Sequence, residues 1–347
     1  MIHTCRHCDA HLSERFLDLG HAPLSNAYLD AAGLQAAEVT YPLRLNVCTA
    51  CRLVQTEDYT SAADVFGADY AYFSSTSSGW VAHAKRYTDM IVERLDLGPD
   101  SFVIELAAND GYLLQHMKAA GVPCLGVEPT TATADAARAK GIEIIEDFFS
   151  MALVETLTAE GKSADLILGN NVYAHVPDIN DFTRAIATAL KPEGMVTLEF
   201  PHLMRMVEHR QFDTVYHEHF SYLSLMTVQR IFETNGLRVV DVEELPTHGG
   251  SLRVYGCRAD ASHVASGNVA SVLAEERTRG MDTPAFYEGF QAEAEAVKDA
   301  AVRFLLDAKR DGKAVAGYGA AAKGNTLMNF AGIRPDLLPR VHDAALA

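Results

Sequence analysis

Two pairs of cysteines, Cys5-x-x-Cys8 and Cys48-x-x-Cys51, have the spacing of a metal site. Each pair can present two thiolates from one turn of backbone, and two such turns complete a tetrahedral cage for Zn²⁺. A cage closed by four thiolates leaves no open position for a substrate. We therefore expect these cysteines to hold a structural zinc ion, with redox-active dithiols as the alternative.

A second group of reactive side chains is the run Tyr216, His217, Glu218 and His219. A neutral imidazole is the natural general base near pH 7. A His-x-His metal site and an ordinary polar strand are the alternatives. In an extended segment the two histidines share one side and Tyr216 and Glu218 share the other, so the four side chains converge only if a turn intervenes.

Small and polar residues follow the first of several predicted buried strands, in the run from Glu105 through Ala107 and Asn109 to Gly111. Ala107 and Asn109 occupy positions that are glycines in a dinucleotide fingerprint, so a nucleoside without a pyrophosphate suits this turn better than NAD. Glu128 ends the next strand, where an acidic side chain binds a ribose diol, although a solvated carboxylate is the alternative. The other candidates at strand ends are Asp147 and Phe148, which could face an adenine, and Asn170.

A glycine loop near the end of the chain, with glycines at 317, 319 and 324, leads into a predicted helix. Free backbone amides before a helix bind anions, and Lys323 can add a cation, so the loop suits a diphosphate. Arg253 either faces the same ligand or forms an ion pair on the surface.

The elements that must position these groups alternate between buried strands and amphipathic helices. We expect strands over 101–106, 124–128, 142–145, 165–169 and 195–200, and helices over 80–95, 113–120, 132–140 and 179–190. This alternation predicts an α/β fold with a doubly wound parallel sheet. Further predictions are strands at 237–242 and 251–257, one long helical segment over 267–309, and a strand over 313–319 followed by a helix over 325–330. The last unit stops at its second strand, near 337–341, so we expect an incomplete C-terminal domain.

The composition limits the partners of the protein. A chain of 347 residues suggests two or three domains, and its formal charge of −17 without a basic run argues against nucleic acid as the main partner. No stretch has the length and apolarity of a membrane span or a leader sequence. With four cysteines paired for metal, and Cys124 and Cys257 left over, a cytoplasmic location is the natural interpretation.

Several motifs in order give a resemblance to a known family. The run from Glu105 to Leu114 followed by Gly126-Val127-Glu128-Pro129 resembles the S-adenosylmethionine site of class I methyltransferases. With the cysteine pairs, the segment 211–222 and the glycine loop 317–325, the chain is similar to the zinc-containing nucleotide-deoxysugar C-methyltransferases. The resemblance spans nearly the whole chain, although members of that family continue further at the C-terminus.

The resemblance implies an activity and a set of residues. A methyl group would pass from S-adenosylmethionine to a carbon beside the ketone of a nucleoside-diphosphate 4-keto-6-deoxysugar. His219 would be the base, supported by Tyr216, Glu218 and His175, with Tyr70 facing the sugar. Tyr72, together with Glu105, Ala107, Asn109, Gly111, Glu128, Asp147, Phe148 and Asn170, would line the donor pocket, and Arg253, Gly319, Lys323 and Asn325 would hold the nucleotide.

This interpretation predicts three parts: a zinc module over 1–75, a class I methyltransferase domain over 76–260, and a Rossmann-like C-terminal sugar-nucleotide domain over 261–347. Two other functions stay open at this point. One is an NAD-dependent sugar-nucleotide oxidoreductase or epimerase that uses the glycine loop as its dinucleotide fingerprint. The other is a non-catalytic zinc-ribbon adaptor.

Overall fold

The structure, a computed structural model, describes residues 4–25, 29–59, 72–319 and 322–343. The chain divides into two compact units. The sheet unit comprises Phe66–His202 and Leu223–Glu276, and the zinc unit comprises Met1–Val65, Leu203–Tyr222 and Arg277–Ala347. The expected division into three domains stays a prediction.

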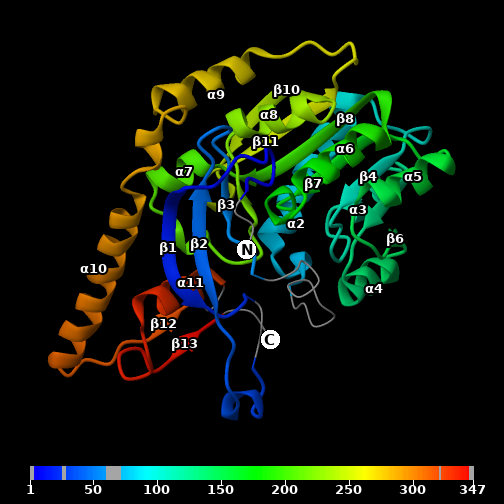
Figure 1. The fold of residues 1–347 in the computed structure, drawn as a ribbon. Coiled ribbons are helices and arrows are strands. Elements are labelled where there is room, and N and C mark those ends of the chain that lie inside the picture. Colours follow the sequence, from blue (N-terminus) through cyan, green and yellow to red (C-terminus); the bar gives the residue numbers. More distant parts are fainter. Residues whose placement is uncertain (1–3, 26–28, 60–71, 320–321, 344–347) are drawn as a thin grey trace. The chain divides into compact units, whose positions relative to one another are not determined.

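The sheet unit is built on a seven-stranded sheet, with the order β10-β11-β8-β7-β4-β5-β6 (Figure 1). Its strands are β4 (Val103–Leu106), β5 (Cys124–Val127), β6 (Glu143–Ile145), β7 (Ala164–Asn170), β8 (Leu190–Pro201), β10 (Leu237–Leu245) and β11 (Ser251–Arg258). The strands from β4 to β8 pair in parallel, as the alternation with helices predicted. The last two depart from this pattern, because β11 runs antiparallel to both β8 and β10.

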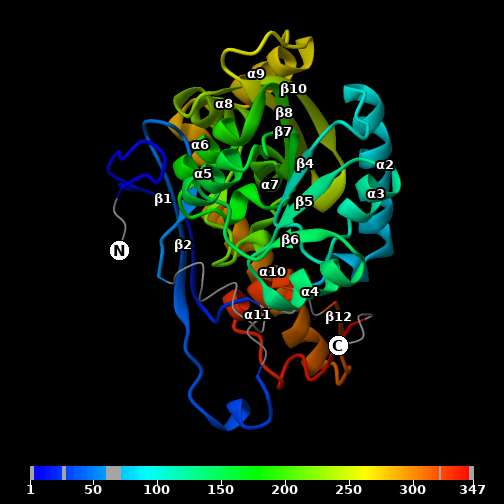
Figure 2. The same ribbon diagram turned by 90° about the vertical axis from the view of Figure 1, so that its right-hand side faces the viewer.

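Helices cover both faces of this sheet (Figure 2). On one side lie α2 (Ser78–Leu95), α3 (Leu114–Ala119) and α4 (Thr131–Ala139), whose apolar residues join the strands in one buried core. On the other lie α5 (Met151–Ala159), α6 (Ile179–Ala189) and α8 (Leu225–Thr234). The strand order reverses at β4, and in such sheets the ligand crevice lies at this switch point, outside the carboxyl ends of the strands.

The zinc unit contains a four-stranded antiparallel sheet in the order β1-β2-β3-β9. Its strands are β1 (Glu14–Ala22), β2 (Tyr41–Val47), β3 (Val54–Thr56) and β9 (Ser221–Tyr222). The same unit holds α7 (Leu203–Glu208), α10 (Phe290–Arg310), α11 (Ala322–Ala331) and a parallel pair, β12 (Gly317–Tyr318) with β13 (Val341–His342). β12, α11 and β13 thus form the strand–helix–strand unit that the sequence predicted, with shorter strands.

The expected single helix over 267–309 was wrong. The structure has α9 (Gly267–Thr278) and α10, separated by a turn and a 3-10 segment over Pro284–Tyr287. Gly280 and Gly289 both have positive φ, at 83° and 87°, which a continuous right-handed helix does not allow. The break coincides with the boundary between the units, because α9 is largely in the sheet unit and α10 is in the zinc unit. None of the helices in the described part of the chain is both long and apolar enough to cross a membrane.

Candidate functional site

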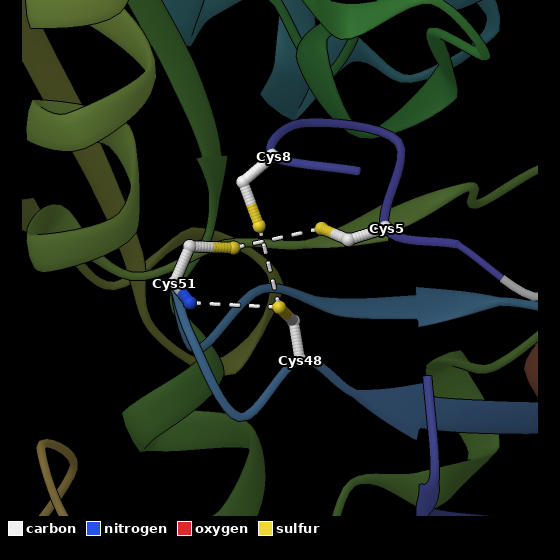
Figure 3. A group of neighbouring side chains, drawn as sticks. All are labelled: Cys5, Cys8, Cys48 and Cys51. Carbon is white, nitrogen blue, oxygen red and sulfur yellow. Dashed lines mark hydrogen bonds between the residues drawn. The ribbon is translucent and has the colours of Figure 1, made fainter. Parts of the chain in front are cut away.

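The four cysteine sulfurs converge on one point of the zinc unit (Figure 3). Cys5 lies 3.5 Å from Cys51 and Cys8 lies 3.5 Å from Cys48, measured between Sγ atoms, and all four sulfurs lie within 4.8 Å of one another. Four ligands about 2.3 Å from a tetrahedral Zn²⁺ are separated by about 3.8 Å. The donor set and its spacing therefore fit zinc.

The local fold explains why these thiols meet. Cys48 and Cys51 lie in the turn of the β2–β3 hairpin. Gln55 on β3 fixes the other pair, because its amide donates to Cys5 Sγ at 3.2 Å and its carbonyl accepts from the Arg6 backbone N–H at 3.0 Å. A thiolate needs such a donor, so Gln55 supports the metal ligand from outside the cage.

The turn after β4 has the backbone shape of a ligand loop. Ala107, Asn109 and Gly111 have positive φ, at 53°, 50° and 73°. Such strain in non-glycine residues persists only where the surroundings hold it, and it concentrates at functional sites. A Cβ at Gly111 would lie 2.4 Å from a methyl carbon of Ile142, so this position is closed to larger residues.

Glu128 stabilises this turn from the end of β5. One carboxylate oxygen accepts from the Asn109 backbone N–H at 2.9 Å, and the other accepts from the Thr130 N–H at 3.0 Å. Glu128 is only 4% exposed. Neither hydrogen bond could be predicted from the sequence, which offered only the position of Glu128 at a strand end.

Asn109 connects the turn to the segment that precedes α2. Its side-chain oxygen accepts from the Ser74 N–H at 2.8 Å, and its amide donates to the Tyr72 carbonyl at 3.0 Å. The structure therefore brings Tyr72 to the turn after β4, whereas Tyr70 lies outside the described residues.

Glu105 is the buried acidic group of this region. Its side chain is fully buried, and burial, together with the charges of Glu128 and Asp110, raises its pKa well above the usual value. Asn170 lies at the end of β7 and is half-buried. Asp147 and Phe148 follow β6 and are both exposed, so they have room to contact a ligand.

The Tyr216–His219 segment is a turn and not a strand. The His219 backbone N–H donates to the Tyr216 carbonyl at 3.0 Å, and the rings of these two residues lie 4.1 Å apart, centroid to centroid. The four side chains can converge only if such a turn is present. Glu218 is 4% exposed, and burial lowers the pKa of His217, whose Nε2 lies 3.2 Å from the Pro42 carbonyl.

His219 has a defined tautomer. Its Nδ1 lies 3.0 Å from the carbonyl oxygen of Thr214. A carbonyl only accepts hydrogen bonds, so the proton of the neutral ring is on Nδ1 and the basic lone pair is on Nε2. His219 is 9% exposed, and its contact with Thr214 orients the ring.

Two comparisons with known proteins give the family. Models of a zinc binding domain, a methyltransferase domain and a C-methyltransferase C-terminal domain match residues 5–66, 80–242 and 246–347. The chain is 34% identical to C-methyltransferase NovU of Streptomyces niveus over 332 residues, which cover 96% of this chain and 79% of the relative. The chain belongs to the C-methyltransferase family. Its donor is S-adenosylmethionine, and this excludes the oxidoreductase and adaptor alternatives.

Other likenesses are more distant. An ubiquinone biosynthesis O-methyltransferase of Bartonella tribocorum is 28% identical over 95 residues, which cover 27% of this chain and 38% of the relative. The structure of magnesium protoporphyrin IX methyltransferase from Synechocystis with bound S-adenosylmethionine has a TM-score of 0.39 and 15% identity, covering 52% of this chain and 81% of that one.

In this C-methyltransferase the glycine loop belongs to the same unit as His219. Gly319 and Asn325 are exposed and Lys323 is half-buried near the start of α11. The nearby charge of Lys323 opposes the effect of burial on Asp213, whose pKa is nevertheless raised. Thr326 donates to the Val215 carbonyl at 3.0 Å, so α11 packs directly on the segment that leads to His219.

His175 and Arg253 are in the sheet unit of the C-methyltransferase. His175 ends a 3-10 turn over Tyr173–His175, after β7. Arg253 is 4% exposed, and its guanidinium donates to Glu199 at 2.7 Å and to Glu243 at 3.1 Å. The ion pair that the sequence offered as an alternative is present, although it is buried inside the unit. A contact of Arg253 with substrate stays a prediction.

The surroundings of Glu199 could not be predicted from any motif in the sequence. This fully buried carboxylate at the end of β8 accepts from His83 at 2.9 Å and from Thr247 at 3.0 Å, besides Arg253. Burial alone would raise the pKa of Glu199, but the hydrogen bond from His83 and the charge of Arg253 outweigh burial and lower it. Its partners come from α2, from the loop after β10 and from β11, a combination that no local motif reveals.

Proposed function

We propose that this C-methyltransferase transfers the methyl group of S-adenosylmethionine to the carbon beside the ketone of a nucleoside-diphosphate 4-keto-6-deoxysugar. His219 is the base. The observation that carries the proposal is the hydrogen bond from His219 Nδ1 to Thr214, because it leaves the basic lone pair on Nε2 of a buried, oriented ring. The four cysteines hold the structural zinc ion.

The chemistry needs a base because a carbon beside a ketone is not nucleophilic until it loses a proton. His219 Nε2 accepts that proton, and the C–H electron pair forms an enolate. The enolate carbon then bonds to the methyl carbon, and the electrons of the broken sulfur–carbon bond stay on sulfur, so S-adenosylhomocysteine leaves. Tyr216, Glu218 and His175 are proposed to stabilise the enolate oxygen and position the sugar.

The donor and the acceptor are proposed to bind mainly through different units. The turn after β4, Glu128 and the strand-end residues of the sheet unit would bind the donor. The loop with Gly319, Lys323 and Asn325 would bind the nucleotide through backbone amides and one cation. Tyr72 is supported as a donor-pocket residue by its hydrogen bond to Asn109, which lies in that turn.

Proton abstraction can be tested apart from methyl transfer. With S-adenosylhomocysteine bound in D₂O, the wild-type protein should exchange the hydrogen beside the ketone of the sugar nucleotide for deuterium, as measured by mass spectrometry. His219→Asn should slow this exchange about 10²- to 10⁴-fold, the usual contribution of a general base. Its affinity for S-adenosylhomocysteine, measured by calorimetry, should not change.

The matched control is His209→Asn, because His209 is an exposed histidine outside the Tyr216–His219 turn. It should exchange like the wild type. Full exchange in His219→Asn would show that another group removes the proton. Absence of exchange in the wild type, despite tight binding of S-adenosylhomocysteine, would argue against a ketosugar substrate.

A further inference from the structure

The sheet unit contains a cavity of about 510 Å³ between α2 and the loop that joins β10 to β11. Its lining includes Tyr72, Trp80, His83, Arg86, Thr247 and His248. Only Tyr72 was among the residues predicted from the sequence. A cavity of this size accommodates part or all of a nucleotide-sized ligand.

The cavity lies at the ligand-binding edge of the sheet. Ser251, just after the loop, pairs with Pro201 at the carboxyl end of β8. The His248 ring lies 2.9 Å from the side-chain amide of Asn171, which directly follows β7. Ligands of open α/β sheets bind outside these strand ends, so the cavity lies where a sheet of this kind binds its ligands.

Backbone strain concentrates at the same place. His248 and Asn171 both have left-handed conformations, with φ of 52° and 55°. Such conformations are unfavourable for residues other than glycine and are retained only where the surroundings impose them. The hydrogen bond between their side chains and the edge-on contact of His248 with Trp80, at 5.3 Å between centroids, hold this conformation at the cavity wall.

The charges in the cavity favour an anion. Arg86 is exposed, and within the described part of the chain its side chain has no ion pair, although the protein carries a formal charge of −17. The buried carboxylate of Glu199, which contacts the lining residues His83 and Thr247, is also paired with Arg253. Its negative charge therefore does not oppose an anion beside Arg86.

We propose that this cavity is an anion-binding subsite of the methyltransferase, with Arg86 as its principal cation. The inference rests on the proposed function, because that function supplies the candidate ligands. The anion is either a phosphate of the acceptor nucleotide or the carboxylate of the donor. Both are acceptors for the planar, charged guanidinium of arginine.

Trp80 allows a direct test, because it lines the cavity and is the single tryptophan of the chain. Its fluorescence should change on titration with inorganic pyrophosphate or with S-adenosylhomocysteine. Arg86→Gln should lower the affinity for the ligand that changes the fluorescence, here called the responsive ligand. The expected loss is about ten- to a hundred-fold, as for a lost charge-assisted hydrogen bond. Pyrophosphate as the responsive ligand identifies the acceptor phosphate as the source, and S-adenosylhomocysteine identifies the donor carboxylate.

Two controls distinguish binding of the anionic group from the other contacts that a ligand makes with the protein. Lys85→Gln removes a neighbouring positive charge on α2 that pairs with Asp89 and does not line the cavity, so it should leave both titrations unchanged. 5′-Methylthioadenosine lacks the carboxylate, so its affinity should be the same in the wild type and in Arg86→Gln. The subsite is refuted if neither anion binds more weakly to Arg86→Gln than to the wild type. Because deuterium exchange by His219 is measured separately, that result would leave the proposed function standing.

Discussion

At the scale of single residues, Glu105 is completely buried and has negatively charged neighbours. Its contribution to the stability of the protein therefore depends on pH. Its pKa is raised in the folded protein by burial and by the charges of Glu128 and Asp110. Between the unfolded and folded pKa values the folded state binds more protons, so this group reduces stability as the pH rises through that range.

Glu105→Gln should therefore melt at a higher temperature than the wild type at pH 7 to 8, and the difference should shrink towards pH 4. Each 1 kcal/mol gained raises the midpoint of a unit of this size by about 2–4 °C. The measurement is thermal unfolding followed by circular dichroism across this pH range. Glu155→Gln, at an exposed glutamate on α5, is the control and should melt like the wild type at every pH. A variant less stable than the wild type at pH 8 would contradict the assignment of Glu105 as an unfavourable buried charge.

The residue types at the candidate site were predictable, but their partners were not. The residue types of the Tyr216–His219 run and of Glu128 at a strand end drew attention to these positions, and the resemblance to a known family then assigned the base to His219. The sequence could not indicate that Thr214 orients His219 or that Glu128 binds the Asn109 N–H, since both depend on turns with particular backbone angles. The cavity beside Arg86 was missed for the same reason, because it is assembled from segments more than 150 residues apart.

At the scale of elements, the β2–β3 hairpin links the cysteine cluster to the His219 segment within the zinc unit. Cys48 and Cys51 form its turn, and Thr56 at its end contacts the backbone beyond His219. The Thr56 N–H donates to the Phe220 carbonyl at 3.2 Å, and the Thr56 hydroxyl donates to the His219 carbonyl at 3.2 Å. Loss of the metal should therefore disturb the orientation of His219.

Chelation of zinc, or Cys48→Ser, should abolish the deuterium exchange that depends on His219 but leave S-adenosylhomocysteine binding by the sheet unit within about threefold. Exchange and calorimetry on the same samples test this expectation, with metal content measured alongside. Cys124→Ser alters a cysteine outside the cluster and should change neither property. Normal exchange in a fully metal-free protein would show that the zinc ion does not organise this segment.

Most elements of the methyltransferase sheet followed from the sequence, because buried parallel strands and amphipathic helices have strong periodic patterns. The elements that were predicted wrongly or not predicted depend on contacts between residues far apart in the sequence. The break between α9 and α10 coincides with the change of unit. At the start of α8, the buried Glu276 from α9 accepts the Leu225 and Met226 N–H groups, and no local motif indicates that pairing.

At the scale of the whole molecule, two units divide the proposed functions. The sheet unit carries the donor turn and the cavity at Arg86, while the zinc unit carries the cysteine cluster, His219 and the glycine loop. The zinc unit is assembled from three separate stretches of sequence, so a linear division into domains captures only part of this organisation. We therefore predict that donor binding, proton abstraction and anion binding can be impaired one at a time.

The position of the transferred methyl group would decide whether the protein methylates the carbon beside the ketone. The protein should be incubated with S-adenosylmethionine labelled with ¹³C in the methyl group and with a nucleoside-diphosphate 4-keto-6-deoxysugar, and the product examined by carbon NMR. We predict a labelled methyl group bonded to the ring carbon beside the ketone. A label on oxygen, or none on the sugar although S-adenosylhomocysteine binds, would contradict the account.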